Sequence, residues 1–473
     1  MTSKQKWVLA LASVSSLMVA LDVTVVATAL GTMRQQLHAS IEQLEWTVNA
    51  YGLSFAVLLM TASALGDRFG RRNLYAAGMG LFVVASAACA LAPDVGWLIA
   101  ARAVQGAGAA VVAPMSLSLL SAAFPPERRG SALGIFGGIT GIAVLAGPVL
   151  GGAVTQGMAW EWIFWLNVPI GLAAIPLVLA RIDESFGPPE RLDVGGLVLV
   201  TGAALGLVWG LVRGNPAGWG SVEVLGALIA GVVLTVAFVI WEMRVKQPML
   251  PMRLFANRAF AVGNASGFLL SAALFSAVFF MAQFQQTTLG QSPLDAGLRL
   301  LPWTGTVFFV APLSGSLVDR IGERPLLVTG LAMQAAGFIW VALIAGVDMS
   351  YGAMIPALIL AGSGVAMAIP AAQNSIVSSV AGADIGKASG TFSTGRQLGG
   401  AFGLAIAVAV FTGAGSYVSP GAFSDGFVAA VAVSGALSLA GAAIGSLLPA
   451  RSADVAVQPG SAVAASASVQ ASS

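Results

Sequence analysis

Residues 63–72 read SALGDRFGRR, and residues 315–324 read GSLVDRIGER. The two segments share a leucine, an adjacent Asp-Arg pair, a glycine and a final arginine in one register. Chance matches of small residues are common, but further matches in one register beside this charged motif indicate an internal repeat. The chain therefore contains two homologous halves. The further matches pair Gly106, Gly108, Pro114, Gly130 and Gly134 with Gly362, Gly364, Pro370, Gly386 and Gly390.

The composition of the chain indicates a membrane protein. Of its 473 residues, 57% are apolar and only 9% are charged. A soluble domain carries about 25% charged residues, so this chain has too few charges to cover a water-facing surface. Its apolar residues come in long blocks, and about 20 apolar residues in a helix cross the bilayer core. The alternating segments typical of an outer-membrane barrel are absent. We therefore predict an all-α membrane protein.

The apolar blocks predict 14 membrane spans, joined by the short connections that packed helices prefer. Their ends are the least certain part of the prediction. We place the spans near residues 7–30, 44–65, 74–92, 95–120, 131–155, 163–180, 194–212, 222–241, 260–283, 298–318, 326–346, 352–378, 391–415 and 426–449.

The distribution of Lys and Arg predicts the orientation of these spans. An even number of spans puts both termini on one side. Eighteen of the 22 Lys and Arg residues, Arg396 among them, fall on the side of the N-terminus, and Arg102 lies within a span. Because short cytoplasmic connections carry an excess of Lys and Arg, we expect both termini to be cytoplasmic and the protein to lie in the cell membrane. The opposite side holds three arginines, Arg34, Arg213 and Arg299.

The repeat and the spans together predict four parts: a six-helix bundle over residues 1–180, two inserted helices over 181–258, a second six-helix bundle over 259–450 and a disordered tail over 451–473. Two homologous halves are typical of transporters, whose substrate lies between them near the bilayer midplane. The net charge of +2 gives no case for nucleic-acid binding. His38 and Cys89 are the only residues of their kinds, so we expect no metal site and no cofactor.

Motifs in the first half resemble those of the major facilitator superfamily. Together with the 14 spans, they resemble its branch of drug:proton antiporters with 14 transmembrane helices. The chain departs from the branch's usual residues at Ala27, Gly31, Ser63 and Glu161. The motifs, in order, are LDVTVVATAL at 21–30, the segment Asp67–Arg72, RAVQGAG at 102–108, GPVLGG at 147–152 and WEWIFWLNVPIG at 160–171.

The resemblance implies a fold and a function. The fold would be two pseudo-symmetric six-helix bundles plus two inserted helices. The function would be multidrug or antibiotic efflux driven by the proton gradient, in a protein that works as a monomer among membrane lipids.

Asp22 is the only carboxylate that we place well inside a predicted span. A charge at such a depth costs several kcal/mol, which makes a functional role the default interpretation. Arg102 lies at a similar distance from the same end of its own span, so the two can meet. We predict that Asp22 and Arg102 form the proton-coupling pair. The alternatives are a purely structural ion pair and a cation bonded to backbone carbonyls.

The two halves differ at this pair. Leu358 takes the place of Arg102 in the repeat, and Leu404 takes that of Pro148. The ionisable pair and the proline bend in the fifth span are therefore predicted to belong to the first half alone.

Two further groups are predicted to act in gating. Small residues of the fifth span can let helices approach closely, while Pro148 can bend the helix; the resemblance implies a seal against leak, and tight packing alone is the alternative. The repeated charged segments would latch the cytoplasmic face, or merely anchor the orientation. The gating residues are Asp67, Arg68, Gly70, Arg71, Arg72, Gln105, Gly106, Gly147, Pro148, Gly151, Gly152, Asp319, Arg320, Gly322 and Arg324.

Candidate substrate contacts are aromatic, Met and amide side chains within spans, because such surfaces adapt to varied ligands. The alternative for each is contact with lipid or a neighbouring helix. The candidates are Trp46, Asn49, Tyr51, Met60, Phe275, Phe279, Met281, Gln283, Met333 and Trp340.

We therefore predict a proton-coupled exporter of an amphipathic drug or antibiotic, either neutral or cationic. A proton-coupled importer of a small nutrient on the same fold is the main alternative. A membrane enzyme or sensor is disfavoured because no cluster of His, Cys or carboxylates stands at a membrane face. A channel is disfavoured because no charged filter sequence is present.

Overall fold

Helices make up every regular element in the computed structural model, which describes residues 1–187, 192–380 and 384–449. Fourteen of its helical segments are long and apolar enough to cross a membrane. This confirms the predicted fold class; the predicted tail at 451–473 lies outside the described residues. The first bundle consists of α1 (Ser3–Gln36), α2 (Ile41–Phe69), α3 (Arg71–Ala90), α4 (Val95–Ala123), α5 (Pro126–Gly157), α6 (Trp162–Trp165) and α7 (Asn167–Arg181).

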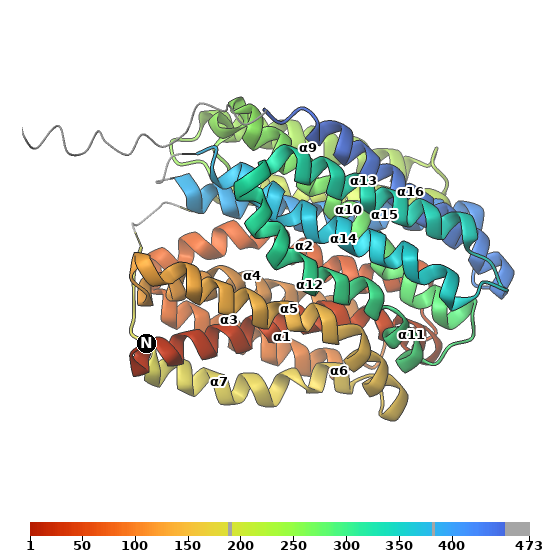
Figure 1. Cartoon of the computed structure of the whole chain (residues 1–473), viewed down its shortest axis with the longest axis horizontal. Helices are drawn as coiled ribbons and strands as arrows, with labels where there is room; N and C mark the ends of the chain where they lie inside the picture. The colour runs from red at the N-terminus through yellow and green to blue at the C-terminus, as the bar shows by residue number, and fades with distance from the viewer. Residues whose placement is uncertain (188–191, 381–383, 450–473) are drawn as a thin grey trace, which may run out of the picture.

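The rest of the chain forms an inserted pair and a second bundle, which lies beside the first (Figure 1). The inserted pair is α8 (Val194–Ala217) and α9 (Val222–Arg244). The second bundle consists of η1 (Met252–Ala256), α10 (Arg258–Thr287), α11 (Pro293–Arg299), α12 (Leu301–Ile321), α13 (Glu323–Ile344), α14 (Tyr351–Val377), α15 (Ile385–Ala414) and α16 (Pro420–Gly445).

The two bundles repeat one packing scheme. In the first, α1 packs on α5 while α4 packs on α2 and α3; in the second, α10 packs on α15 while α14 packs on α12 and α13. The repeated charged segments form matching turns, in which Gly70 (φ 101°) and Gly322 (φ 84°) each separate two helices. A positive φ suits glycine because it has no Cβ. The halves are therefore similar in structure as well as in sequence.

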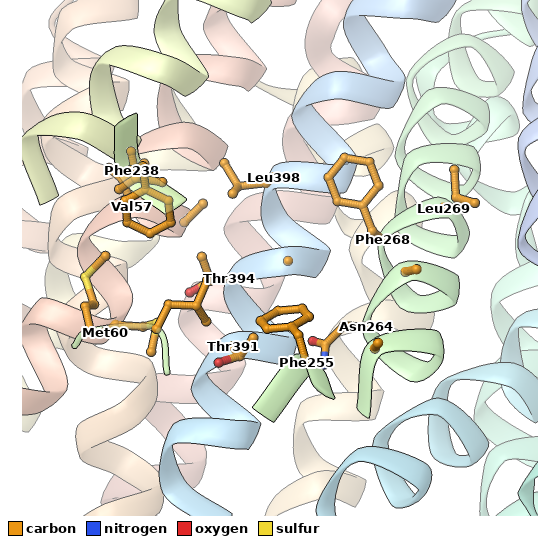
Figure 2. Close-up of a pocket in the computed structure, with 17 residues that line it drawn as sticks. Val57, Met60, Phe238, Phe255, Asn264, Phe268, Leu269, Thr391, Thr394 and Leu398 are labelled. Atoms are coloured by element: carbon orange, nitrogen blue, oxygen red, sulfur yellow. The ribbon is translucent and has the colours of Figure 1, made fainter. Parts of the chain in front are cut away.

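The inserted helices α8 and α9 pack on each other, and α8 also contacts α2 and α15. A Cβ on Gly206 would lie 3.0 Å from the carbonyl oxygen of Ala227, so small residues let the two helices approach closely. The pair thus rests on both bundles. Between α8, α9, α2, α10 and α15 lies a cavity (Figure 2).

Two predicted spans are each broken into two helices. The span predicted at 163–180 is interrupted between α6 and α7, and the span at 298–318 is interrupted between α11 and α12. Pro169 and Pro302 follow these breaks closely. Because proline has no N–H, the carbonyls four residues earlier, at Trp165 and Leu298, lose their usual helical partner.

One predicted boundary was wrong in a way that matters. The structure begins α15 at Ile385, six residues before the predicted start of that span. Arg396, which the sequence analysis assigned to the cytoplasmic face, is therefore eleven residues inside a helix. It lies about 16 Å along the helix axis from the helix start.

The bundles meet tightly at one end. We call the end at which α1 begins the basic end, since the charged turns at Gly70 and Gly322 lie there. At the opposite end, Gln286 of α10 donates a 3.0 Å hydrogen bond to the carbonyl of Thr28 on α1. The guanidinium of Arg34 lies 4.0 Å from the ring centre of Tyr417. These contacts close the seam between the bundles at that end.

The glycines of α5 also show that the contact between the bundles is tighter at the opposite end than near the basic end. A Cβ on Gly152, toward the opposite end, would lie 2.7 Å from Cα of Leu294 and closer still to the carbonyl oxygen of Pro293. A Cβ on Gly138, in the half nearer the basic end, would meet no atom within 4 Å. The close packing of α5 against the second bundle is therefore concentrated at the opposite end.

Alanine substitutions at these two glycines should have opposite effects. Alanine favours a helix over glycine by about 1 kcal/mol, so Gly138→Ala should leave the melting temperature of the purified protein equal or higher. Gly152→Ala gains the same propensity but overpacks the seam, at about 1–3 kcal/mol, and should lower it. Thermal unfolding in one detergent compares them. Equal melting temperatures would show that the seam is not tightly packed.

Candidate functional site

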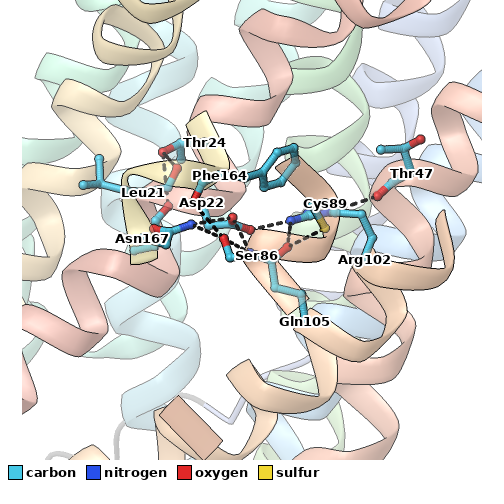
Figure 3. A network of polar contacts seen from close by, with 11 residues as sticks. Leu21, Asp22, Thr24, Thr47, Ser86, Cys89, Arg102, Gln105, Phe164 and Asn167 are labelled. Atoms are coloured by element: carbon cyan, nitrogen blue, oxygen red, sulfur yellow. Dashed lines mark hydrogen bonds and ion pairs between the residues drawn. The ribbon is translucent and has the colours of Figure 1, made fainter. Parts of the chain in front are cut away.

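A buried carboxylate lies at the centre of the first bundle. Asp22 is only 3% exposed, midway along α1. Its Oδ2 accepts a 2.5 Å hydrogen bond from Nη1 of Arg102 on α4, and its Oδ1 accepts from Gln105 and Asn167 at 2.7 and 3.2 Å. These three hydrogen bonds replace contacts with water that the buried carboxylate lacks. The structure thus brings together the predicted pair, Asp22 and Arg102, as Figure 3 shows.

Arg102 is fixed by more than its ion pair. Its Nη1 also donates to Oε1 of Gln105 at 2.7 Å, and its Nε donates to the carbonyl of Thr47 at 3.2 Å. The rings of Tyr51 and Phe164 lie over the guanidinium, with centres 4.3 and 5.7 Å from Cζ. Aromatic faces attract a cation, more so away from water. The positive charge is therefore shared among one carboxylate, oxygen acceptors and two rings.

Three neutral side chains complete the network, and two of them come from further helices. Gln105, one turn after Arg102 on α4, bridges both members of the pair. Ser86 of α3 accepts from Gln105 and Asn167 at 3.2 and 3.0 Å and donates to the carbonyl of Phe164 at 3.0 Å. We call Asp22, Ser86, Arg102, Gln105 and Asn167 the polar network. Asp22 is the one acidic side chain among these five residues.

The polar network faces away from the second bundle. Helical geometry turns the chain by about 100° per residue, which puts Thr24 and Thr28 on the face of α1 roughly opposite Asp22. Thr24 donates to the carbonyl of Ala143 on α5 at 3.3 Å, and the Thr28 carbonyl accepts from Gln286 of α10. Asp22 thus lies on one face of α1, and the opposite face of α1 contacts the second bundle at the seam.

The glycines of the GPVLGG motif divide between two neighbours. A Cβ on Gly147 or Gly151 would collide with Thr24 or Thr28 of α1. Gly152 faces α11, and a Cβ on Gly297 of α11 would collide with the Pro148 carbonyl. The motif therefore lies between α1 and α11. On α4, Gly106 lies against the backbone of Tyr51 in the same way.

The charged segment at the basic end is bound to its own half. Asp67 accepts from Nε of Arg71 at 2.8 Å. Glu184, which follows α7, accepts from the backbone N–H of Arg72 at 2.8 Å and of Asn73 at 3.2 Å. Arg68 is exposed. In the described part of the chain, no ion pair joins this segment to the second bundle.

The second charged segment does not reproduce these contacts. Arg320 and Arg324 are both exposed, and Glu323 accepts instead from Asn374 of α14 at 2.7 Å. The side chain of Asp319 lies outside what the structure describes. The repeat therefore preserves the turn at Gly322, while the described side chains form different bonds.

The candidate substrate contacts are dispersed. Trp46 packs on Trp209 of α8 with ring centres 5.8 Å apart, whereas Trp340 is 43% exposed on α13, far along the chain in the other bundle. Asn49 donates to Glu45 at 3.1 Å, and Tyr51 covers Arg102. The first-bundle candidates thus belong to the bundle interior or to the contact with the inserted pair.

In the second bundle three of the six candidates are buried. Phe279 packs edge-on against Phe280, Gln283 accepts from the hydroxyl of Tyr417 at the seam, and Met281 is fully buried. Phe275 is partly exposed beside Gly400 of α15. These ten residues therefore do not line one pocket.

The sequence analysis missed or misjudged four polar residues. Glu45 on α2 is fully buried, and its Oε2 has no hydrogen-bond partner, so Asp22 is not the only buried carboxylate in a span. Ser86 and Asn167 hold the Asp22 pair although neither is ionisable. Arg396, placed inside α15, donates to Ser271 of α10 at 3.2 Å and forms no ion pair with a described residue.

No group of three or more His, Cys, Asp or Glu among the described residues is arranged to hold a metal ion. The site consists of one ion pair and neutral amides, hydroxyls and rings. It offers no nucleophile activated by a neighbouring base.

Curated proteins similar to this chain are resistance and export proteins. The "Tetracenomycin C resistance and export protein" of Streptomyces glaucescens is 36% identical over 396 residues, covering 83% of this chain and 73% of the relative. A "Methylenomycin A resistance protein" of Streptomyces coelicolor is 36% identical, covering 82% of each chain. The "Multidrug resistance protein Stp" of Mycobacterium tuberculosis is 35% identical over 82% of this chain and 72% of the relative.

Solved structures agree on the fold. A bacterial homolog of the human lysosomal transporter Spinster, in an inward-facing and unoccupied conformation, matches with a TM-score of 0.68 at 16% identity, covering 95% of this chain and 97% of that one. The peptide transporter POT in complex with sulfate matches with the same TM-score over 94% of this chain and 99% of that chain. The family model described as "Major Facilitator Superfamily" matches residues 12–404 and 264–471. The chain is therefore a multi-pass membrane transporter, not an enzyme, and it belongs to the major facilitator superfamily.

Proposed function

We propose that this protein is a proton-coupled antiporter that exports an amphipathic drug or antibiotic across the cell membrane by alternating access. The observation that supports the coupling is the Asp22–Arg102 ion pair. It is buried inside the first bundle, and its Oδ2 and Nη1 atoms lie 2.5 Å apart. The names of three relatives, two of them resistance proteins for single antibiotics, support the direction of transport and the class of substrate. The proton gradient is the energy source, and no cofactor takes part.

The described conformation corresponds to an inward-facing state under this proposal. The seam is closed at the opposite end by Gln286 on Thr28 and by Gly152 on α11. Toward the basic end, α2 and α15 still pack on each other, whereas α4 and α14 are not among the closely packed helix pairs. The basic end would be cytoplasmic, because cytoplasmic connections carry the excess of Lys and Arg. Both termini would then lie inside the cell.

Protonation of Asp22 would rearrange the hydrogen bonds of the whole polar network. A neutral carboxyl no longer balances the guanidinium, and breaking a buried pair costs about 3–5 kcal/mol. Arg102 would therefore draw on its remaining acceptors, Gln105 and the Thr47 carbonyl. Because Thr47 belongs to α2 and Asp22 to α1, the proton alters the bonds between helices that also form the seam. Substrate need not touch the carboxylate.

Asp22→Asn should abolish export, because the amide cannot exchange a proton and presents an N–H₂ group to Arg102. We expect the native chain to confer resistance to at least one antibiotic in an efflux-deficient host, and the variant to fall to the level of the empty host. Asp348→Asn, which removes an exposed carboxylate between α13 and α14, should keep full resistance. Membrane abundance of each variant is measured alongside.

Retained resistance in Asp22→Asn at equal abundance would remove Asp22 as the coupling residue. Accumulation of the labelled compound by cells carrying the native chain would instead indicate an importer.

The number of coupled protons sets the response to membrane potential. One proton exchanged for one monovalent cation moves no net charge, whereas each net charge adds about 2.3 kcal/mol per 100 mV. If Asp22 alone carries the proton, uptake of an exported monovalent cation into everted vesicles should follow an imposed pH gradient and ignore an imposed potential. Uptake driven by the potential alone would contradict a single carrier and direct attention to Glu45, another buried carboxylate of the first bundle.

A further inference from the structure

A cavity of about 490 Å³ lies where the inserted pair meets both bundles. Its walls come from α2, α8, α9, α10 and α15, together with the connection that follows α9 (Figure 2). Small-molecule sites usually measure about 300–1,000 Å³. None of the residues of the polar network lines this cavity, so the cavity is separate from the network. Representative wall residues are Met60, Val200, Phe238, Met249, Ala265 and Leu398.

The cavity has a fixed structure on its inserted side. The carboxylate of Glu242, near the end of α9, accepts from the backbone N–H of Leu250 at 2.9 Å. The hydroxyl of Thr61 on α2 contacts the sulfur of Met249 at 3.7 Å. These two bonds hold the connection after α9 over the cavity. Without the inserted pair, this side of α2 and α15 would have no wall.

The lining is apolar except for Asn264 and two threonines. Asn264 lies on α10, is only 8% exposed, and donates from Nδ2 to the Phe260 carbonyl at 2.9 Å. Its Oδ1 has no hydrogen-bond partner, and neither has Oγ1 of Thr394 on α15. Thr391 is already bonded, since its hydroxyl donates to the Lys387 carbonyl at 2.7 Å. The cavity thus offers one unused amide oxygen and one unused hydroxyl.

An unpaired buried acceptor destabilises the fold, and native structures rarely leave one without a partner. Oδ1 of Asn264 can only accept, so the group that would satisfy it is an N–H or O–H. A phospholipid acyl chain has neither. The rest of the lining, with Met and Phe side chains, suits an apolar body of variable shape.

The depth of the cavity fits a ligand that is dissolved in the membrane. Asn264 is six residues from the start of α10, and Thr391 is six residues from the start of α15. At 1.5 Å per residue, both lie about 9 Å from the helix ends at the basic end. The cavity therefore lies in the half of the span nearer the basic end, at the depth of one leaflet.

We propose that this cavity is a binding site for an uncharged lipophilic molecule that carries an N–H or O–H donor, with Asn264 as its polar anchor and the inserted helices as its wall. A ligand in this site would contact both bundles and the inserted pair at once. Its occupancy does not depend on proton coupling, and Asp22→Asn protein should retain it.

A matched pair of photoreactive probes tests this site in the purified full-length protein. 4-Hydroxybenzophenone carries an apolar body and one donor; 4-methoxybenzophenone has the same body without the donor. After irradiation, mass spectrometry measures labelling at Met60 and Met249, which line the cavity. We expect the hydroxyl probe to label them at least tenfold more than the methoxy probe.

Three variants identify the cause of the labelling. Asn264→Leu should reduce labelling by the hydroxyl probe to the level of the methoxy probe. Ala265→Trp should fill the cavity and abolish labelling by both. Ala230→Trp, on an exposed position of α9, should change neither. Gel-filtration profiles identical to that of the native protein establish that each variant is folded.

The proposal is overturned if the two probes label the native protein equally, or if Ala265→Trp leaves labelling unchanged. It is also overturned if added phospholipid removes the labelling by both probes to the same extent, because the site would then hold an acyl chain. Loss of resistance in Asp22→Asn with labelling retained would separate this site from the coupling mechanism.

Discussion

An Asp–Arg pair that is cut off from water governs how the first bundle is assembled. Hydrocarbon cannot solvate either charge, so each is stable only while the other and its hydrogen-bond partners are in place. Asp22 comes from α1 and Arg102 from α4, while Ser86 and Asn167 come from α3 and α7. The network therefore specifies the arrangement of four helices that apolar packing alone would leave free to slide, because lipid is as apolar as their side chains.

The second bundle shares the fold of the first but not its charge chemistry. Leu358 occupies the repeat position of Arg102 and is fully buried among apolar side chains. This half has a partly buried cation instead, Arg396, whose described partners are the Ser271 hydroxyl and the face of Phe392, 5.7 Å away. A pseudo-symmetric scaffold thus places a charge-balanced network in one half and an unbalanced cation in the other. Proton exchange and substrate recognition can therefore reside in different halves.

The sequence predicted the large features because they follow from composition and depth. Long apolar blocks gave the number of spans, and equal distances from the span ends brought Asp22 and Arg102 to one level. Ser86 and Asn167 could not be predicted, since a neutral polar residue in a span has no signature that separates a network member from a helix-capping hydroxyl. Arg396 was assigned to the cytoplasmic face because it lies near the start of the predicted span at 391–415, but α15 begins six residues before that span. The cavity depends on how α8 and α9 rest on the bundles, which no local pattern encodes.

Under the proposed coupling, α1 offers a direct route from Asp22 to the seam between the bundles. Asp22 faces the interior of the first bundle, while Thr24 and Thr28 on the other side of the same helix contact α5 and α10. A helix is stiff over such a distance, and Gly147 and Gly151 hold α5 directly against it. A change in the bonds of Asp22 that shifts α1 by a fraction of an ångström is therefore felt at the seam, since packed interfaces switch between discrete arrangements and do not deform continuously. The small residues of the GPVLGG motif bring α5 into direct contact with α1. Under the proposed coupling, this contact would link a change at Asp22 to the seam between the bundles.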